Sequence, residues 1–154
     1  MNGGALANQS GRNSEDDIAD AMRRRQYEFD RQAVVGVSIY GSILRADFLV
    51  HNIVEFPVGL VIESKWQDTP GTADEKFPYM VANIRAGNYR HPVVVVVYGG
   101  GCRPGAVRWF QDQVDGQQLV AVFSFEGLLS WLKRHVHVHV TSPTLPSTTR
   151  SNPG

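Results

Sequence analysis

Disulfides, long apolar segments and a net charge are all missing from this sequence. Its one cysteine, Cys102, cannot form a disulfide within the chain, which favours a reducing compartment. The longest apolar run, residues 93–97, is far too short to cross a bilayer, and no apolar segment near the amino terminus resembles a signal peptide. We therefore expect a soluble, cytoplasmic protein with no membrane partner.

The charge balance excludes one class of nucleic-acid binder. Fifteen Lys and Arg residues against fifteen Asp and Glu residues give a formal charge of zero, so the chain does not coat nucleic acid through bulk electrostatics. A local basic groove stays possible. Twelve of the fifteen cations are arginine, whose guanidinium forms forked contacts to phosphate better than lysine does.

The length and composition indicate one folded domain with flexible ends. A chain of 154 residues can bury a core without a disulfide or a structural metal. Residues 1–13 are small, polar and glycine-rich, and we expect a flexible lead there. Residues 141–154 carry three prolines and many hydroxyls, which predicts a disordered tail. The single domain is expected over residues 14–140.

Local patterns predict alternating helices and strands. Ser14, with Asp17 three residues on, is typical of a helix start, and that helix ends in a basic turn at residues 23–25. Strands are expected at residues 33–40, 45–50 and 59–66. A helix capped by Thr72 and Glu75 follows, with a kink or a fresh start at Pro78.

The second half of the chain continues the alternation. The valine run at residues 93–98 is typical of a strand buried on both faces. A helix from Pro104 to Gly116, a strand at residues 119–124 and a last helix complete the order α-β-β-β-α-β-α-β-α. This order predicts an α/β fold with a mixed β-sheet flanked by helices.

Acidic side chains gather on two neighbouring predicted strands. Because side chains alternate along a strand, Val61, Glu63, Lys65 and Gln67 share one face. If the strand at residues 45–50 pairs antiparallel with this one, opposing positions sum to about 110, and Asp47 lies opposite Glu63. Two like charges facing each other are destabilising, so either a cation lies between them or one carboxyl is protonated.

A hard divalent cation satisfies this arrangement. Mg²⁺ binds oxygen ligands, needs only one or two protein carboxylates and leaves positions for water and a phosphate oxygen. Such an ion assists hydrolysis at phosphorus, and Lys65 could orient or deprotonate the attacking water or hold the phosphate. The residues thus predict a Mg²⁺ site at Asp47 and Glu63, with Mn²⁺ able to substitute.

Three stretches together resemble a known family. "RADFLV", "GLVIESKWQ" and "GTADEKFPYMVANI", in this order, resemble the PD-(D/E)XK nuclease superfamily, which includes restriction endonucleases and Holliday-junction resolvases. The resemblance covers roughly residues 14–125 and implies a restriction-endonuclease-like fold with an α-β-β-β-α-β core. Ala46 stands where the family name has proline.

The resemblance also implies roles for individual residues. Asp47 matches the first acid of the motif, Glu63 the second acid and Lys65 the lysine. The backbone carbonyl of Ser64 would be a further metal ligand. Two more catalytic residues are implied, an acid on the first helix and a glutamine just after the lysine: Glu15 and Gln67.

Other features of the sequence carry weaker alternatives. "YGGGCRPG" follows a buried strand, where a glycine-rich loop could bind phosphate, but it lacks the Lys-Ser/Thr pair that ends a P-loop. A plain turn is the simpler interpretation. His135, His137 and His139 alternate and could bind a transition metal if they formed a strand, although imidazole is not a typical Mg²⁺ ligand.

The residues and the resemblance together predict a hydrolase, a Mg²⁺-dependent DNA endonuclease, and the resemblance and the short chain imply that it acts as a homodimer. Symmetric cutting of a duplex would need two copies of so short a chain. Two alternatives stay open. One is a non-catalytic nucleic-acid-binding or assembly module that keeps the nuclease fold. The other is a small-molecule-binding α/β domain with a closed pocket at residues 99–101.

Overall fold

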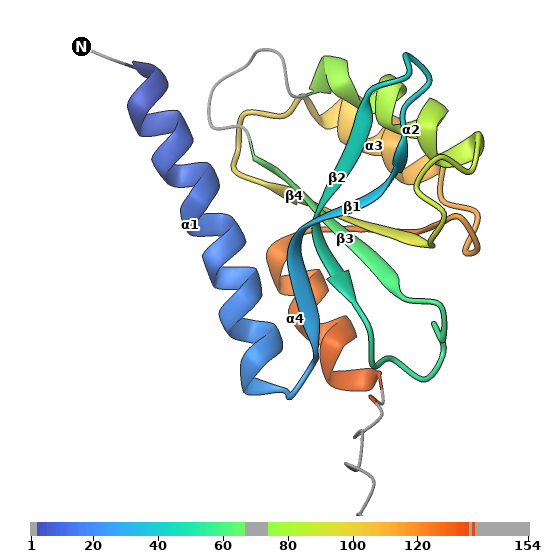
Figure 1. Cartoon of the computed structure of the whole chain (residues 1–154). Helices are drawn as coiled ribbons and strands as arrows, with labels where there is room; N and C mark the ends of the chain where they lie inside the picture. The colour runs from blue at the N-terminus through green and yellow to red at the C-terminus, as the bar shows by residue number, and fades with distance from the viewer. Residues whose placement is uncertain (1–2, 67–73, 136, 138–154) are drawn as a thin grey trace, which may run out of the picture.

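The computed structural model describes residues 3–66, 74–135 and 137, with side chains from Ser14 onward. The described residues form four α-helices, one short 3-10 helix and five strands in the predicted order (Figure 1). Their bounds are α1 (Gly3–Arg24), β1 (Phe29–Val37), β2 (Ile43–Val50), β3 (Leu60–Trp66), η1 (Asp74–Lys76), α2 (Phe77–Arg85), β4 (Val93–Tyr98), α3 (Pro104–Asp112), β5 (Leu119–Phe123) and α4 (Phe125–Arg134).

The five strands form one mixed sheet in the order β1-β2-β3-β4-β5. The pairs β1/β2 and β2/β3 are antiparallel, whereas β3/β4 and β4/β5 are parallel. Short connections allow the antiparallel pairs, and a crossover helix stands between each parallel pair, as parallel pairing requires. The prediction of a mixed α/β sheet of the restriction-endonuclease-like type is confirmed.

Helices cover both faces of the sheet. We call the side covered by α1 and α4 the first face and the side covered by α2 and α3 the second face (Figure 1). The valine run of β4 is buried on both, since Val94 and Val96 pack in the first cluster and Val93 and Val95 in the second. This confirms the buried strand that the apolar run predicts.

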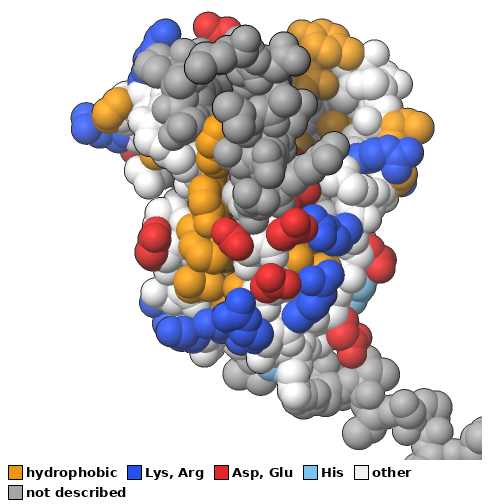
Figure 2. Space-filling view, turned by 90° about the vertical axis from the view of Figure 1, so that its left-hand side faces the viewer, with side chains coloured by type: hydrophobic (Ala, Val, Ile, Leu, Met, Phe, Trp, Pro, Cys, Tyr) orange, Lys and Arg blue, Asp and Glu red, His pale blue; other side chains and the backbone are white. Residues whose placement is uncertain are grey.

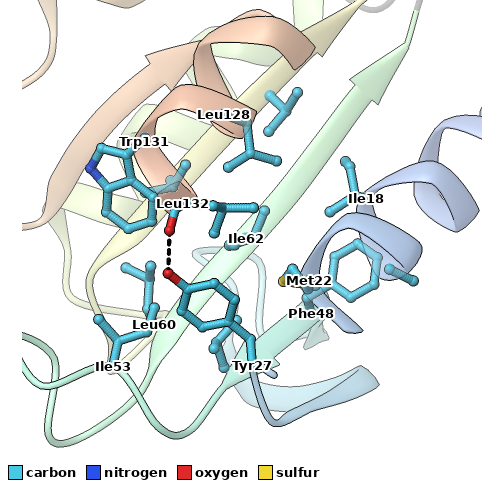
Figure 3. Packing of buried hydrophobic residues seen from close by; sticks show 14 residues of the cluster. Ile18, Met22, Tyr27, Phe48, Ile53, Leu60, Ile62, Leu128, Trp131 and Leu132 are labelled. Atoms are coloured by element: carbon cyan, nitrogen blue, oxygen red, sulfur yellow. Dashed lines mark hydrogen bonds between the residues drawn. The ribbon is translucent and has the colours of Figure 1, made fainter. Parts of the chain in front are cut away.

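The core of the first face brings the first helix, α1, against the last helix, α4 (Figure 3). Ile18 and Met22 of α1 pack with Leu128 and Leu132 of α4 across the side chains of β2 and β3. The Tyr27 hydroxyl donates to the backbone carbonyl of Leu132 at 2.6 Å and lies 2.9 Å from that of His135, its alternative acceptor. These contacts fix α1 against the sheet, and α1 carries Glu15.

The first helix begins earlier than the sequence pattern indicates. Backbone helix is already present at Gly3, so the predicted N-cap at Ser14 is wrong. The flexible lead expected over residues 1–13 stays a prediction. Residues 3–13 contain no proline and can continue a helix. Ser14 lies buried inside the helix, where its hydroxyl is 3.2 Å from the Ser64 hydroxyl rather than capping an end.

The remaining element boundaries follow local chemistry. A fresh helix starts at Phe77, with Pro78 in its first turn, which is one of the two outcomes expected there. The predicted cap at Thr72 lies outside the described residues. Ser124 caps α4 by accepting a hydrogen bond from the Gly127 N–H at 3.1 Å.

The histidines after α4 are used in packing. The His135 ring lies 3.9 Å from the Trp131 ring, and its Nδ1 is 3.4 Å from Glu55 Oε2. The His137 ring lies 4.9 Å from the Tyr27 ring. His139 lies outside the described residues. His135 and His137 thus each have an aromatic neighbour.

Candidate active site

Both strands of the first hairpin change face at the same rung. In β2, Ala46 packs in the cluster of the second face, whereas Phe48, only two residues on, packs in that of the first face. In β1, Phe29 belongs to the first face and Ala33 to the second. A regular strand keeps such positions on one side, so the sheet is locally rotated between these rungs.

Gln32 and Asp47 occupy the rung where the faces change. The pairs Arg31↔Phe48 and Ala33↔Ala46 flank it on either side. Gln32 has the left-handed backbone conformation, with φ of 52°, which is unfavourable by about 1–2 kcal/mol for a residue other than glycine. This rotation takes the Asp47 side chain out of the regular alternation and turns it toward β3.

Asp47 and Glu63 exchange hydrogen bonds through each other's strand. The backbone N–H of Asp47 donates to Glu63 Oε1 at 2.8 Å, and the backbone N–H of Ser64 donates to Asp47 Oδ2 at 2.7 Å. These bonds continue the pairing of β2 and β3 beyond its last regular rung, Phe48↔Ile62. The residue numbers of the regular pairs between β2 and β3 sum to 110, as predicted. The two acids meet at the next position along the strands.

Burial and mutual repulsion disfavour the charged form of Glu63. Its exposed fraction is only 4%. Burial, followed by the charge of Asp47, raises the pKa of Glu63 to about 7, although Lys65 and the Asp47 N–H act in the opposite direction. The carboxyl pair therefore carries negative charge that the described protein groups only partly neutralise.

Lys65 lies on the same side of β3 as Glu63. Its Nζ is 3.6 Å from Glu63 Oε2, and its side chain is 27% exposed. Val61 packs in the cluster of the second face, and alternation places Glu63 and Lys65 on that face as well. The acid is therefore buried, while the ammonium group two residues later reaches solvent.

Glu15 approaches the pair from α1. Burial, the charge of Asp47 and a side-chain hydrogen bond with Asp47 raise the pKa of Glu15 to about 7, against the influence of Arg31. Arg31 Nη2 is 3.7 Å from Glu15 Oε2, and Arg31 Nη1 is 3.0 Å from Asp16 Oδ1. The structure thus brings Glu15, Asp47, Glu63 and Lys65 together, four of the residues that the sequence singles out.

The roles predicted for two further residues, Ser64 and Gln67, stay predictions. Ser64 lies between the two key positions of β3, and its N–H is used by Asp47, while the role of its carbonyl as a metal ligand stays a prediction. Gln67 lies outside the described residues.

Sequence reasoning missed three neighbours of the site. Gln32 sets the change of face, Arg31 partly neutralises Glu15, and Tyr89 is buried beneath the acids. Burial and then the charges of Glu63 and Asp47 raise the pKa of Tyr89 well above its usual value. No local pattern marks these residues, because their importance depends on contacts between distant segments.

The possible metal ligands are few. Within residues 3–66, 74–135 and 137, no group of three or more His, Cys, Asp or Glu side chains is arranged to hold a metal ion. Two carboxylates on facing strands nevertheless fit the oxygen chemistry of Mg²⁺, which commonly uses one or two protein carboxylates together with water and substrate phosphate.

The surface beside the site carries charges of both signs. On the side of the molecule that shows α1, acidic and basic side chains are interspersed (Figure 2). On α1, Asp20 pairs with Arg23 of the same helix, and Asp16 pairs with Arg31 from β1. The mixture agrees with a chain of zero formal charge and does not form a uniformly basic face there.

An open pocket of about 250 Å³ lies away from the glycine-rich loop. Tyr89, Arg90, His91 and Pro92 contribute to its walls, which places it at the amino end of β4. The loop at residues 99–101 follows the opposite end of that strand. This pocket therefore does not provide the site that a small-molecule domain built on that loop would use.

The fold and the acidic pair define a chain of the restriction-endonuclease-like class. A family model described as "PD-(D/E)XK nuclease superfamily domain" matches residues 6–136, most of the chain. The chain belongs to this superfamily, which indicates a nuclease-type function and a nucleic-acid substrate. No curated protein and no solved structure matches it. Among the described residues, no helix combines the length and apolar character of a membrane span.

Proposed function

We propose that the protein is a divalent-metal-dependent endonuclease that hydrolyses phosphodiester bonds in DNA. The observation that carries this proposal is the Asp47 and Glu63 pair, in which each carboxylate accepts a hydrogen bond from a backbone N–H of the strand that carries the other. An acid pair whose charge is partly uncompensated and of which Glu63 is buried is costly for stability alone, and perturbed carboxyl groups of this kind concentrate at functional sites.

Asp47 and Glu63 would hold Mg²⁺ or Mn²⁺, with the Ser64 carbonyl as a further ligand. A divalent cation bound there supplies positive charge to the phosphate oxygens as the phosphodiester is cleaved. The chain's own contribution is to fix two oxygen ligands, since each carboxylate is oriented by a backbone N–H of the opposite strand.

Lys65 would orient the attacking water or hold the scissile phosphate. Its ammonium group reaches solvent beside the buried Glu63, so substrate and protein can meet at this point. Glu15, with a pKa of about 7, can take up or release a proton next to Asp47 at neutral pH. Gln67 lies two residues after Lys65 in the chain and is proposed to assist.

Symmetric duplex cutting would require a homodimer, because one chain carries one such site. We include dimerisation, and a cytoplasmic location, in the proposal.

DNA cleavage tests the proposal. Supercoiled, linear and branched DNA are incubated with the protein in Mg²⁺ or in EDTA. We compare wild type with Asp47→Asn, Lys65→Ala and the control Asp112→Asn, which removes an exposed acid on α3. Cleavage by wild type and the control, but by neither site variant and never in EDTA, supports the proposal. Equal cleavage by all four proteins contradicts it, and DNA binding without cleavage favours the non-catalytic alternative.

A further inference from the structure

The turn between β1 and β2 exposes apolar side chains to solvent. We call residues 37–43 the hairpin tip. Tyr40 at its apex is 81% exposed, and Ile43, at the start of β2, is 63% exposed. Val37 and Ile39 are about half exposed as well. Large apolar groups gathered at one exposed point commonly mark a contact site, whereas single ones need no explanation.

The hairpin tip is held in one conformation. The Ser38 N–H donates to the Ser42 carbonyl at 2.7 Å, and the two serine hydroxyls lie 2.7 Å apart. The side chain of Asn83, fully buried in α2, accepts from the Ile39 N–H at 2.8 Å. A buried amide is thus used to fix an exposed turn, so the tip presents its apolar groups in a set position.

Tyr40 has a preset ring orientation. Its ring stacks on that of Tyr79 from α2, with centroids 5.5 Å apart and planes inclined by 14°. The Asn83 side chain also donates to the backbone carbonyl of Tyr79, so one residue holds the backbone at Tyr79 and at Ile39, the neighbour of Tyr40. A nearly parallel aromatic pair, one member of which is largely exposed, is a surface on which a further flat ring can stack.

The hairpin tip and the candidate active site share one strand. Ile43, Arg45 and Asp47 follow one another at alternate positions of β2, and Arg45 is exposed between the other two. Leu44 and Ala46, the intervening positions, pack on the second face. Four residues of strand span about 13 Å, which corresponds to roughly four nucleotides of a stacked nucleic-acid strand.

We propose that the hairpin tip contacts unstacked bases of DNA, with Tyr40 stacking on a base a few nucleotides from the cleaved bond and Arg45 contacting the intervening phosphate. This inference rests on the proposed function and narrows the substrate to DNA with unpaired bases, such as a junction, flap or bulge. Exposed aromatic rings bind the bases of single strands by stacking, and apolar side chains can insert between base steps and partly unstack them.

A nucleic acid suits the hairpin tip better than a second protein. A stable protein interface buries on the order of 800 Å² from each partner, and one turn with four apolar side chains is a small area beside this. The tip also continues directly into the strand that bears Asp47, so a substrate seated at the acids extends toward it. Dimerisation through the tip is retained as a contradicting outcome below.

The test compares two DNA substrates that differ only in a short bulge. The full chain is assayed by single-turnover cleavage in Mg²⁺ and by fluorescence anisotropy in EDTA, using wild type, Tyr40→Ala and Tyr40→Phe. Trp109→Ala, which removes an exposed aromatic ring from α3, is the matched control. A 2-aminopurine in the bulge reports stacking through the quenching of its fluorescence.

We expect Tyr40→Ala to lower binding and cleavage of bulged DNA by about 5-fold to 100-fold more than those of paired DNA, since stacking contributes about 1–3 kcal/mol per base. Quenching should be lost in Tyr40→Ala and kept in Tyr40→Phe and Trp109→Ala. Equal effects on both substrates, or a change of oligomeric state in Tyr40→Ala, would overturn the inference. Asp47-dependent cleavage without a preference for bulged DNA would refute it and leave the proposed function standing. Bulge binding that depends on Tyr40, without any cleavage, would support base contact by the hairpin tip and refute the proposed function.

Discussion

The backbone N–H of Asp47 donates to the Glu63 carboxylate, while the Asp47 carboxylate accepts from the N–H of Ser64, the residue after Glu63. Each acid is therefore oriented by the strand that carries the other. The distance between the two carboxyl groups is set by the register of β2 and β3 rather than by flexible loops. A substitution in either strand at this point would therefore disturb both acids.

Asp47 has separable structural and chemical roles. Asp47→Ala leaves the Ser64 N–H without its acceptor, which should destabilise the fold by about 1–3 kcal/mol. Asp47→Asn keeps a side-chain oxygen at this position and should stay within about 1 kcal/mol of wild type, yet both variants should lose DNA cleavage. Urea unfolding at pH 5.5, where Glu15 and Glu63 are mostly neutral, measures the difference. Equal stability of Asp47→Ala and wild type would argue against the hydrogen bond.

The stability of the metal-free protein should fall as the pH rises from about 4.5 to about 7. Burial raises the pKa of Glu63 from 4.5 to about 7, so the folded state holds this proton more strongly than the unfolded state does. The stabilisation is complete below the unfolded pKa and is lost as the pH passes the folded one. Thermal unfolding in EDTA should show a decrease of several degrees, since one pKa unit corresponds to about 1.4 kcal/mol.

Glu63→Gln provides the matched control for this pH dependence. Glutamine keeps an oxygen for the Asp47 N–H and removes the ionisable group. The variant should be more stable than wild type in EDTA at pH 8 and similar to it at pH 5. An unchanged pH profile in the variant would show that other groups cause the effect, with Glu15 as the first to examine.

Lys65 should affect rate far more than stability. Lys65→Ala removes an ammonium group that is partly exposed, so the free energy of unfolding should change by less than about 1 kcal/mol. The cleavage rate should fall by about 100-fold or more if Lys65 orients the water or the phosphate. Lys133→Ala, in the last turn of α4, serves as the control and should leave the rate unchanged. Equal rates for both variants would exclude Lys65 from the chemistry.

Gly36 should tolerate no side chain. A Cβ at this position would lie 1.7 Å from the backbone carbonyl oxygen of Asn88, at the irregularity in the pairing of β1 with β2. Gly36→Ala should therefore cost more than about 3 kcal/mol or prevent folding. Gly105→Ala, where no atom would lie within 4 Å, should be neutral or slightly stabilising in α3. Chemical denaturation of the two variants checks this contrast.

Local chemistry predicts much of this fold. The valines of β4, the proline at the start of α2 and the alternation in β3 are features of neighbouring residues, and the structure confirms them. The antiparallel register that brings Asp47 opposite Glu63 also follows from sequence, whereas the rotation that turns the Asp47 side chain toward β3 does not. Periodicity and turn residues carry this information directly.

Long-range packing decides what the sequence pattern does not. The cap at Ser14 fits every local rule, yet the residue is inside α1, where it faces Ser64 from β3. Nothing near Gln32 in the chain indicates a left-handed residue in a strand, since the conformation is linked to the rotation at Asp47. Tyr89 becomes a neighbour of the acids only when β3 and the segment after α2 pack together.

Binding of Mn²⁺, measured by isothermal titration calorimetry at pH 8 and pH 5.5, tests most directly whether Asp47 and Glu63 form a cation site. We predict one site per chain that is weaker at the lower pH, where the proton of Glu63 competes with the metal. Glu63→Gln should lose this binding and Asp112→Asn should keep it. Equal binding by wild type and Glu63→Gln at pH 8 would contradict the account.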